Sequence, residues 1–362
     1  MVHRPFLKSR RVQFSLGLLV TVACLTWAMY SIKSGRPWRE VLAEIGDAFR
    51  QADYRTLPLL WGILVVFYWL KAVRWKLLLA PVGDFDATRD LLPPIMAGFA
   101  LNNVLPARVG ELIRVLLFSR SRQVPAVTVL ASVAVERILD ALTILVLLGI
   151  GISRLDNVDP DVQRVLQSAA LVVGGAVGGI LIYLIWTRQF LRLAQWGVRR
   201  VPLLPAAIGE EVMGILRTGA DGLAALKRGR LLGGIIATSF AQWVLNALYL
   251  IVALWAFDIP LPWDGALVLM GVVAFGVAIP SVPGYFGVMQ FWFLVVLRQI
   301  LEVSAEEKIV AASIYYQLSQ FIPVTLIGLI CANRLGFALS DADSGDSPVP
   351  SEKQEPDPDA SN

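Results

Sequence analysis

Long, unbroken runs of apolar residues dominate this sequence of 362 residues. A helix of about 20 apolar residues is long enough to cross the ~30 Å hydrocarbon core of a bilayer. We expect full membrane spans at residues 14–32, 57–73, 127–152, 166–186, 231–257 and 309–332. The pattern therefore predicts an all-α polytopic membrane protein with about six transmembrane helices.

Two further apolar segments are interrupted near their midpoints. Residues 91–118 are broken between Pro106 and Gly110, and residues 266–301 are broken at 280–287, where Pro283 and Gly287 repeat the Pro-x-x-x-Gly spacing. Irregular backbone at membrane depth is tolerated only where protein covers it or a wet cavity lines it. The two breaks therefore predict two re-entrant helical hairpins beside a substrate site, as in transporters.

Lysine and arginine in short loops indicate the orientation of the spans. Basic residues crowd the N-terminus (1–13), the end of the second span (Lys71, Arg74 and Lys76) and the loop 187–230. These facts agree if both termini are cytoplasmic and the two hairpins open to opposite sides. The halves 14–152 and 166–335 then form an inverted-topology repeat. The alternative is a chance similarity of two Pro/Gly-rich loops.

The regions outside this transmembrane domain (14–335) are short. The loop 187–230 contains amphipathic stretches suited to the cytoplasmic surface of the membrane. Residues 336–362 are rich in Asp, Ser and Pro and should be disordered. The first apolar run exceeds the usual ~7–15 residues of a signal peptide, so we expect an uncleaved anchor in the inner (cytoplasmic) membrane.

Composition narrows the chemistry. The chain is 56% apolar and 17% charged, with a mean hydropathy of +0.65. Its only histidine is His3, and both cysteines fall inside predicted spans. Histidine-based catalysis and His-ligated metals are therefore not expected, and we predict no cofactor, no metal and no nucleic-acid partner.

Charged residues within membrane segments are costly and mark function by default. After the first break, Arg108, Glu111 and Arg114 fall along one side of a helix whose start offers free N–H groups to an anion. Asn102 and Asn103 add neutral hydrogen-bonding groups just upstream. We predict an anion-binding site here; the alternative is that Glu111 simply neutralises one arginine.

The third span carries a second charged group, formed by Glu136, Arg137 and Asp140. Spacings of three and four residues place these side chains close together on a helix. They are expected to form ion pairs across the bundle with Arg108 or Arg114, or else to take up a proton.

The predicted membrane segments in the second half of the chain carry uncharged polar residues in place of the charged groups of the first half. Span five offers Gln242 and Asn246 on one helical face, and span six offers Tyr316, Gln317 and Gln320. The two stripes either form a furrow that passes a lipid headgroup or supply interhelical hydrogen bonds, worth only ~0.6 kcal/mol each in lipid. The neighbouring second break contributes the candidate site residues Pro283, Gly284, Gly287 and Gln290.

Three motifs in order, at 103–114, 136–140 and 280–287, resemble the lysylphosphatidylglycerol synthase transmembrane family of flippase-like membrane proteins. The resemblance covers roughly residues 16–335 and implies movement of a lipid between leaflets. The best-understood members resemble a flippase fused to a cytosolic aminoacyltransferase domain. With the chain ending at Asn362, we do not expect lipid aminoacylation.

The second hairpin departs from that family. Its members usually read Pro-Gly-Gly-x-Gly with a glutamate three residues on, whereas this chain has Tyr285 and then Gln290. If the glutamate recognises a cationic headgroup, as the resemblance implies, a neutral or anionic headgroup is expected here.

The sequence thus predicts a flippase-like or scramblase-like lipid translocator that is not an enzyme. Its partners would be anionic phospholipids or polyprenyl-phosphate-type lipids, with a second copy of the chain or a lipid-modifying enzyme as protein partner. One alternative is a membrane glycosyltransferase acting on a polyprenyl phosphate, because the paired acids Asp84 and Asp86 are of a kind that can hold Mg²⁺ and a nucleotide diphosphate. Another is a non-transporting accessory of a lipid-modifying enzyme.

Overall fold

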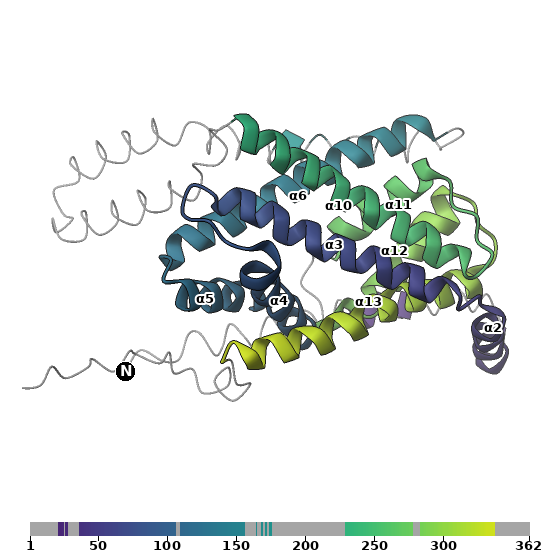
Figure 1. Cartoon of the computed structure of the whole chain (residues 1–362). Helices are drawn as coiled ribbons and strands as arrows, with labels where there is room; N and C mark the ends of the chain where they lie inside the picture. Colours follow the sequence, from purple (N-terminus) through teal and green to yellow (C-terminus); the bar gives the residue numbers. More distant parts are fainter. Residues whose placement is uncertain are drawn as a thin grey trace, which may run out of the picture.

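A computed structural model describes residues 36–105, 109–155, 229–277 and 283–336, with isolated positions within 21–27 and 164–175. All regular secondary structure in these residues is helical, which confirms the all-α prediction (Figure 1). The N-terminal region 1–13, the loop 187–228 and residues 337–362 lie outside the described residues, as do most of the predicted spans 14–32 and 166–186.

Four long helices run side by side through the structure (Figure 1). They are α3 (Thr56–Leu79), α6 (Ala126–Arg154), α10 (Gly229–Trp255) and α13 (Glu306–Arg334). Helices α3, α10 and α13 are long and apolar enough to cross a membrane. Helix α6 is as long as α13, at 29 residues, but carries the charged group at 136–140 in its middle. All four coincide with spans predicted from the sequence.

Two pairs of shorter helices occupy the segments with predicted breaks. Helices α4 (Leu92–Val104) and α5 (Gly110–Arg122) flank the first break. Helices α11 (Trp263–Gly276) and α12 (Val288–Leu294), the latter continued by the π-helical η5 (Val295–Ile300), flank the second. A helix of 13 residues is only about 20 Å long, too short for a full crossing. Residues 106–108 and 278–282 are outside the described part of the chain.

Glycines allow the close approaches that these short helices need. A Cβ on Gly110 would overlap the carbonyl oxygen of Gly98, so α4 and α5 meet in backbone contact. A Cβ on Gly328 would likewise overlap the carbonyl oxygen of Met96, where α13 crosses α4. Packing of this density between helices is typical of membrane proteins, where small residues let backbones approach.

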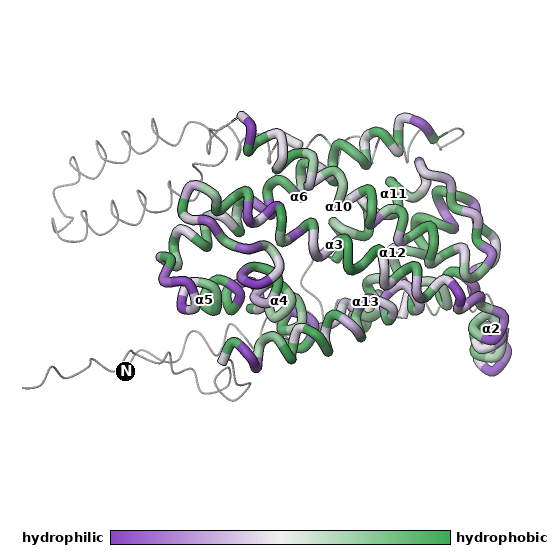
Figure 2. The backbone as a smooth tube through the Cα atoms, viewed as in Figure 1, coloured by the Kyte–Doolittle hydropathy of each residue, from purple (hydrophilic) through white to green (hydrophobic). Residues whose placement is uncertain are grey.

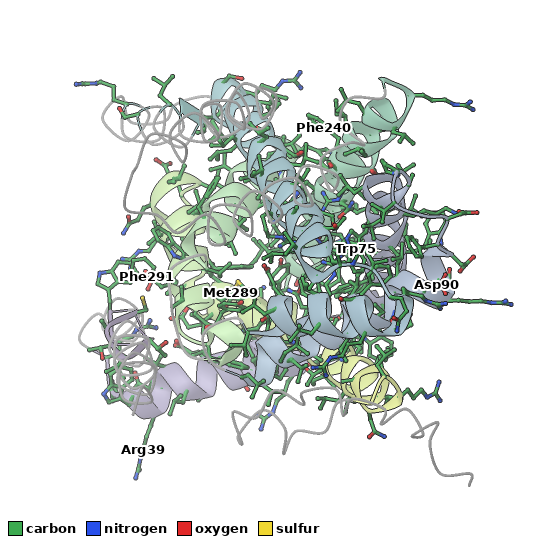
Figure 3. The ribbon with its side chains drawn as sticks, turned by 90° about the vertical axis from the view of Figure 1, so that its left-hand side faces the viewer. Arg39, Trp75, Asp90, Phe240, Met289 and Phe291 are labelled. Atoms are coloured by element: carbon green, nitrogen blue, oxygen red, sulfur yellow. The ribbon has the colours of Figure 1, made fainter. Side chains whose placement is uncertain are left out.

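The helix contacts follow a regular scheme. Helix α4 packs against α13, α11 packs against α6, and α3 packs against α10. The pair α4–α5 lies toward one end of the bundle and the pair α11–α12 toward the other (Figure 1). Apolar residues predominate along the long helices, and hydrophilic residues occur in the connections and also at points within the bundle (Figure 2). In the view along the bundle, Trp75 lies among the helices and Arg39 points away from them (Figure 3).

Helix α2 (Trp38–Gln51) is an element that the sequence analysis did not identify. Its 14 residues are too few to span a membrane, and its residues Val41 and Ala48 are buried against the bundle. Arg36, just before it, forms ion pairs with Glu44 of α2 and Glu307 of α13. The helix is therefore an amphipathic cover at the end of the bundle where α13 begins.

Candidate functional site

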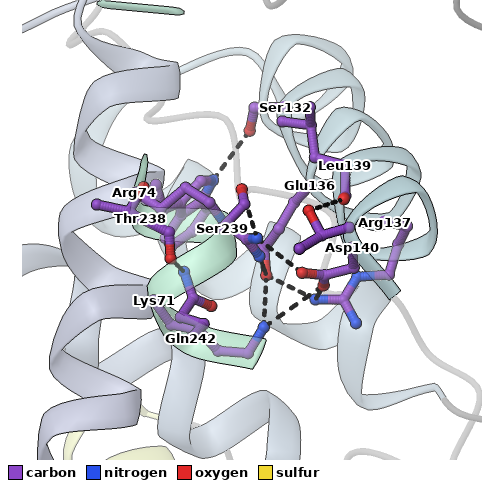
Figure 4. A network of polar contacts seen from close by, with 12 residues as sticks. Lys71, Arg74, Ser132, Glu136, Arg137, Leu139, Asp140, Thr238, Ser239 and Gln242 are labelled. Atoms are coloured by element: carbon purple, nitrogen blue, oxygen red, sulfur yellow. Dashed lines mark hydrogen bonds and ion pairs between the residues drawn. The ribbon is translucent and has the colours of Figure 1, made fainter. Parts of the chain in front are cut away.

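A buried cluster of charged residues joins α3 to α6 (Figure 4). Lys71 Nζ lies 3.2 Å from Glu136 Oε1, and Arg74 Nη1 donates to Asp140 Oδ1 at 2.7 Å. The side chains of Lys71 and Arg74 are 4% and 0% exposed. The sequence analysis used these two residues as orientation charges at the end of a span, whereas the structure buries both side chains inside the bundle. Helix α3 continues to Leu79, so both lie within the helix and face α6.

Arg114 of α5, the helix that follows the first break, belongs to the same cluster. Its Nη2 donates to Glu136 Oε2 at 2.9 Å, and its guanidinium lies 3.8 Å from the centre of the Trp75 ring. Cation–π contact of this kind strengthens when water is excluded. The expected ion pair between Arg114 and the acids of the third span is therefore present.

Arg137 is the member of the cluster that reaches open space. Its guanidinium contacts Glu136 at 2.6 Å and Asp140 at 3.2 Å, and it lies 3.6 Å from Glu111 of α5. Its side chain is 37% exposed. The other three cations of the cluster, Lys71, Arg74 and Arg114, are all at most 4% exposed.

Positive charge exceeds negative charge in this cluster. Four cations (Lys71, Arg74, Arg114 and Arg137) face the carboxylates of Glu136 and Asp140 and, at the edge, that of Glu111. Within the described residues, the Nε atoms of Arg74 and Arg114 have no hydrogen-bond partner. An excess charge in a low-dielectric interior is costly unless a counter-ion neutralises it. The cluster is therefore suited to an anionic ligand next to Arg137.

A cavity of about 380 Å³ adjoins Arg137 and extends between the two breaks. Its walls are mainly apolar and aromatic, contributed by α3, α4, α6, α10, α11 and α13. Pockets of this composition, with a few polar groups, are typical ligand sites. The predicted site residues in its wall are Asn102, Asn103, Glu111, Arg137, Asp140, Asn246, Gly284, Tyr316, Gln317 and Gln320.

Other predicted site residues lie elsewhere. Arg114, Glu136 and Gln242 are buried and do not line the cavity. Arg108 belongs to the first break and lies outside the described residues. Gly287 and Gln290 are buried in the second break, where Pro283 opens a short 3₁₀ turn.

The asparagines before the first break hold the backbone as well as facing the cavity. Asn102 Oδ1 accepts a hydrogen bond from the Gly110 N–H at 2.8 Å. Asn103 Nδ2 donates to Thr325 Oγ1 of α13 at 2.9 Å. Asn102 thus occupies one of the N–H groups at the start of α5 that were expected to be free for an anion.

Two glutamines hold the second break together. Gln290 Oε1 accepts from the Gly287 N–H at 2.7 Å, and Gln290 Nε2 donates to Gln317 Oε1 at 2.8 Å. Gln317 Nε2 in turn donates to the Gly284 carbonyl. Positive φ angles of 78° at Gly284 and 85° at Gly287 explain why glycine occurs at these turns. Gln290 therefore stabilises the backbone of the second break through hydrogen bonds to Gly287 and Gln317.

The two polar stripes of spans five and six serve two purposes. Ser239, one turn before Gln242 on α10, accepts from Arg74 Nη1 at 3.1 Å, and Gln242 Nε2 donates to the Thr238 carbonyl within α10, so both side chains are buried in internal bonds. Asn246, Tyr316 and Gln320 instead line the cavity. Some residues of the stripes therefore form internal hydrogen bonds, and others form a polar wall of the cavity.

The paired acids before α4 have local partners. Asp86 Oδ1 accepts from the Thr88 and Arg89 N–H groups at 2.9 and 2.7 Å, which holds the pKa of Asp86 below its usual value. Asp84 lies 3.3 Å from Lys76 and is almost fully exposed. Neither lines the cavity. Across the described ranges, no group of three His, Cys, Asp or Glu side chains is arranged to hold a metal ion.

Comparisons with known proteins agree with the resemblance noted in the sequence. The family described as "Lysylphosphatidylglycerol synthase TM region" matches residues 14–328. The curated protein named "Glycosyltransferase AglD" from Haloferax volcanii is 26% identical over 351 residues, covering 88% of this chain and 54% of that protein. The chain thus spans about half the length of this relative.

The relative corrects one expectation. The sequence analysis predicted that the chain is not an enzyme, and similarity to a protein named a glycosyltransferase contradicts that prediction. The relative also favours the glycosyltransferase alternative over lipid translocation.

Proposed function

The chain belongs to the lysylphosphatidylglycerol synthase transmembrane family, and we propose that it binds a polyprenyl-phosphate-type lipid during glycosyl transfer. The lipid phosphate would lie beside Arg137, in the cavity between the two breaks. The observation that supports this proposal is the excess of positive charge in the cluster. Arg137 is the cation of the cluster that is exposed to the cavity.

Arginine suits this role because its planar guanidinium can donate two parallel hydrogen bonds to phosphate oxygens. Glu136 and Asp140 contact Nη2 of Arg137 and Glu111 lies 3.6 Å from Nη1, so the guanidinium is positioned before a ligand arrives. Aromatic and aliphatic walls, including Phe67 and Phe99, suit the first isoprene units of a lipid. The glycosyl-transfer part of the proposal rests on the name of the relative.

Binding of polyprenyl phosphate by the purified chain in lipid nanodiscs tests the proposal. The Arg137→Gln variant should bind this lipid roughly ten- to hundredfold more weakly, because a hydrogen bond to a charged group contributes about 1.5–3 kcal/mol. Arg137→Lys, which keeps the charge and loses the planar fork, should bind with intermediate affinity.

A matched control is Arg122→Gln at the end of α5, where Arg122 pairs with Asp90 away from the cavity. It should bind the lipid like the parent chain. Sugar transfer from a nucleotide sugar to the lipid phosphate should depend on Arg137 in the same order. Unchanged lipid binding by a folded Arg137→Gln variant would overturn the proposal.

Lipid translocation is a second candidate, and the arrangement of the short helices favours it. We propose that α4–α5 and α11–α12 are re-entrant hairpins of an inverted repeat. Exchanging the halves turns the α4–α13 contact into α11–α6 and leaves α3–α10 unchanged. Six spans with both termini in the cytoplasm of an inner-membrane protein fit this arrangement and the basic loops.

Leaflet transfer of a labelled lipid phosphate in liposomes distinguishes this candidate. Translocation predicts faster transfer with the protein than in protein-free liposomes, and slower transfer with Arg137→Gln. Glycosyl transfer without any acceleration of leaflet transfer would exclude translocation while leaving the first proposal intact.

A further inference from the structure

The two ends of the cavity differ in charge. Glu111 and Arg137 lie at the end next to the first break, whereas Gly284 and Tyr285 of the second break line the other end. Around the second break, the polar groups in the wall are amides and hydroxyls. A ligand that fills the whole cavity would therefore present a charge at one end and uncharged polar groups at the other.

Three polar side chains of the cavity wall contact one another. The side chains of Asn246 from α10 and Gln320 from α13 form hydrogen bonds with the hydroxyl group of Tyr316. Asn246 and Gln320 are half-buried and line the cavity. A side-chain amide carries two donors and an acceptor oxygen with two lone pairs, so one bond to Tyr316 leaves capacity for a ligand.

An aromatic ring completes this end. Tyr285 adopts a φ of 60°, a left-handed conformation that is uncommon for residues other than glycine. It is half-buried and lines the cavity beside Gly284. Strain of this kind persists where the surrounding structure enforces it and frequently marks a ligand site. The ring offers an apolar face in the same cavity wall as the amides of Asn246 and Gln320.

We propose that this end is a subsite for an uncharged hexose, stacked on Tyr285 and hydrogen-bonded by Asn246 and Gln320. Neighbouring hydroxyl groups of a sugar match amides that both donate and accept, and the apolar face of its ring matches an aromatic side chain. The inference rests on the proposed phosphate site at Arg137. It identifies the preferred ligand as a lipid phosphate that already carries a sugar, rather than the bare carrier.

The test compares two lipids on the full chain in nanodiscs: polyprenyl phosphate and polyprenyl phosphate bearing one hexose. The parent chain should bind the hexose-bearing lipid more tightly. Tyr285→Gly should reduce that affinity about three- to tenfold and leave the affinity for the bare lipid unchanged. Because glycine relieves the strained φ, the loss of the ring should not prevent this variant from folding. Asn246→Ala should show the same selective loss, by about the value of a neutral hydrogen bond.

Gln123→Gly is the matched control, because Gln123 has a φ of 56° at the end of α5 and does not line the cavity. It should leave both affinities unchanged. Equal affinity of the parent chain for the two lipids, or an equal loss for both in Tyr285→Gly, would overturn the sugar subsite alone. Failure of the parent chain to bind either lipid would instead overturn the proposed function on which it rests.

Discussion

Replacing Glu136 with glutamine removes the carboxylate on which the buried cluster converges. Its two oxygens lie within 3.3 Å of Lys71, Arg74, Arg114 and Arg137, and its side chain is fully buried. Glutamine keeps the size of the side chain, removes the charge and replaces one acceptor oxygen with an NH2 donor. The variant therefore tests the combined role of the charge and of the hydrogen bonds that this carboxylate accepts.

The structure sets the expected magnitude. Removing one partner of a buried ion pair costs about 3–5 kcal/mol, because the remaining charge stays buried without compensation. Here the cluster already has more cations than acids, so Glu136→Gln should fall at or above that range. Lys71→Met removes a cation from the same cluster and brings the charges closer to balance. We therefore expect it to destabilise the protein less than Glu136→Gln does.

Denaturation of the purified variants in detergent, followed by loss of helical signal, measures these differences. Glu111→Gln is the control, because Glu111 is about one-third exposed and makes one longer contact of 3.6 Å with Arg137. Exposed pairs of this kind contribute about 0–1 kcal/mol. A Glu136→Gln variant as stable as Glu111→Gln, or more stable than Lys71→Met, would refute the reasoning.

Other predictions concern the two breaks. Gly110→Ala should destabilise the α4–α5 contact by about 1–3 kcal/mol, because its methyl group would overlap the Gly98 carbonyl. Gly62→Ala, with open space around it, should be neutral or slightly stabilising. Equal melting temperatures for the two variants would contradict the close approach of α4 and α5. Gln290→Glu should cost about 1–3 kcal/mol, since glutamate cannot donate to Gln317 Oε1 while accepting from the Gly287 N–H. Unchanged stability of Gln290→Glu in the same denaturation assay would show that the hydrogen bond from Gln290 to Gln317 does not contribute to stability.

The sequence predicted the helices well because their signal is long and redundant. Runs of 20 or more apolar residues leave few alternatives in a membrane, and the Pro-x-x-x-Gly spacing located both helix interruptions. Helix α2 was missed because polar residues interrupt its apolar ones and its length is below that of a span. Its position depends on contacts with α13 that no local pattern encodes.

The candidate site was only partly predictable. Glu136, Arg137 and Asp140 stood out as charges within an apolar run, and their pairing with Arg114 followed from charge. Lys71 was misread because a basic residue near the end of a span fits both an orientation charge and a buried partner. The choice depends on how far α3 continues, and it continues to Leu79.

The role of Gln290 was also beyond the reach of the sequence. Its position suggested a contact with the headgroup, by resemblance to a glutamate in the family. The structure instead places it in a chain of hydrogen bonds with Gly287 and Gln317 behind the cavity wall. Side-chain direction within an irregular turn depends on backbone angles, which spacing alone does not determine.

The most direct test of the central claim is an experimental structure of the full chain in nanodiscs loaded with polyprenyl phosphate. The account predicts density for the phosphate within hydrogen-bond distance of the Arg137 guanidinium, with the lipid chain leaving through the apolar wall of the cavity. Phosphate density confined to the membrane surface, with the cavity beside Arg137 free of lipid, would contradict it.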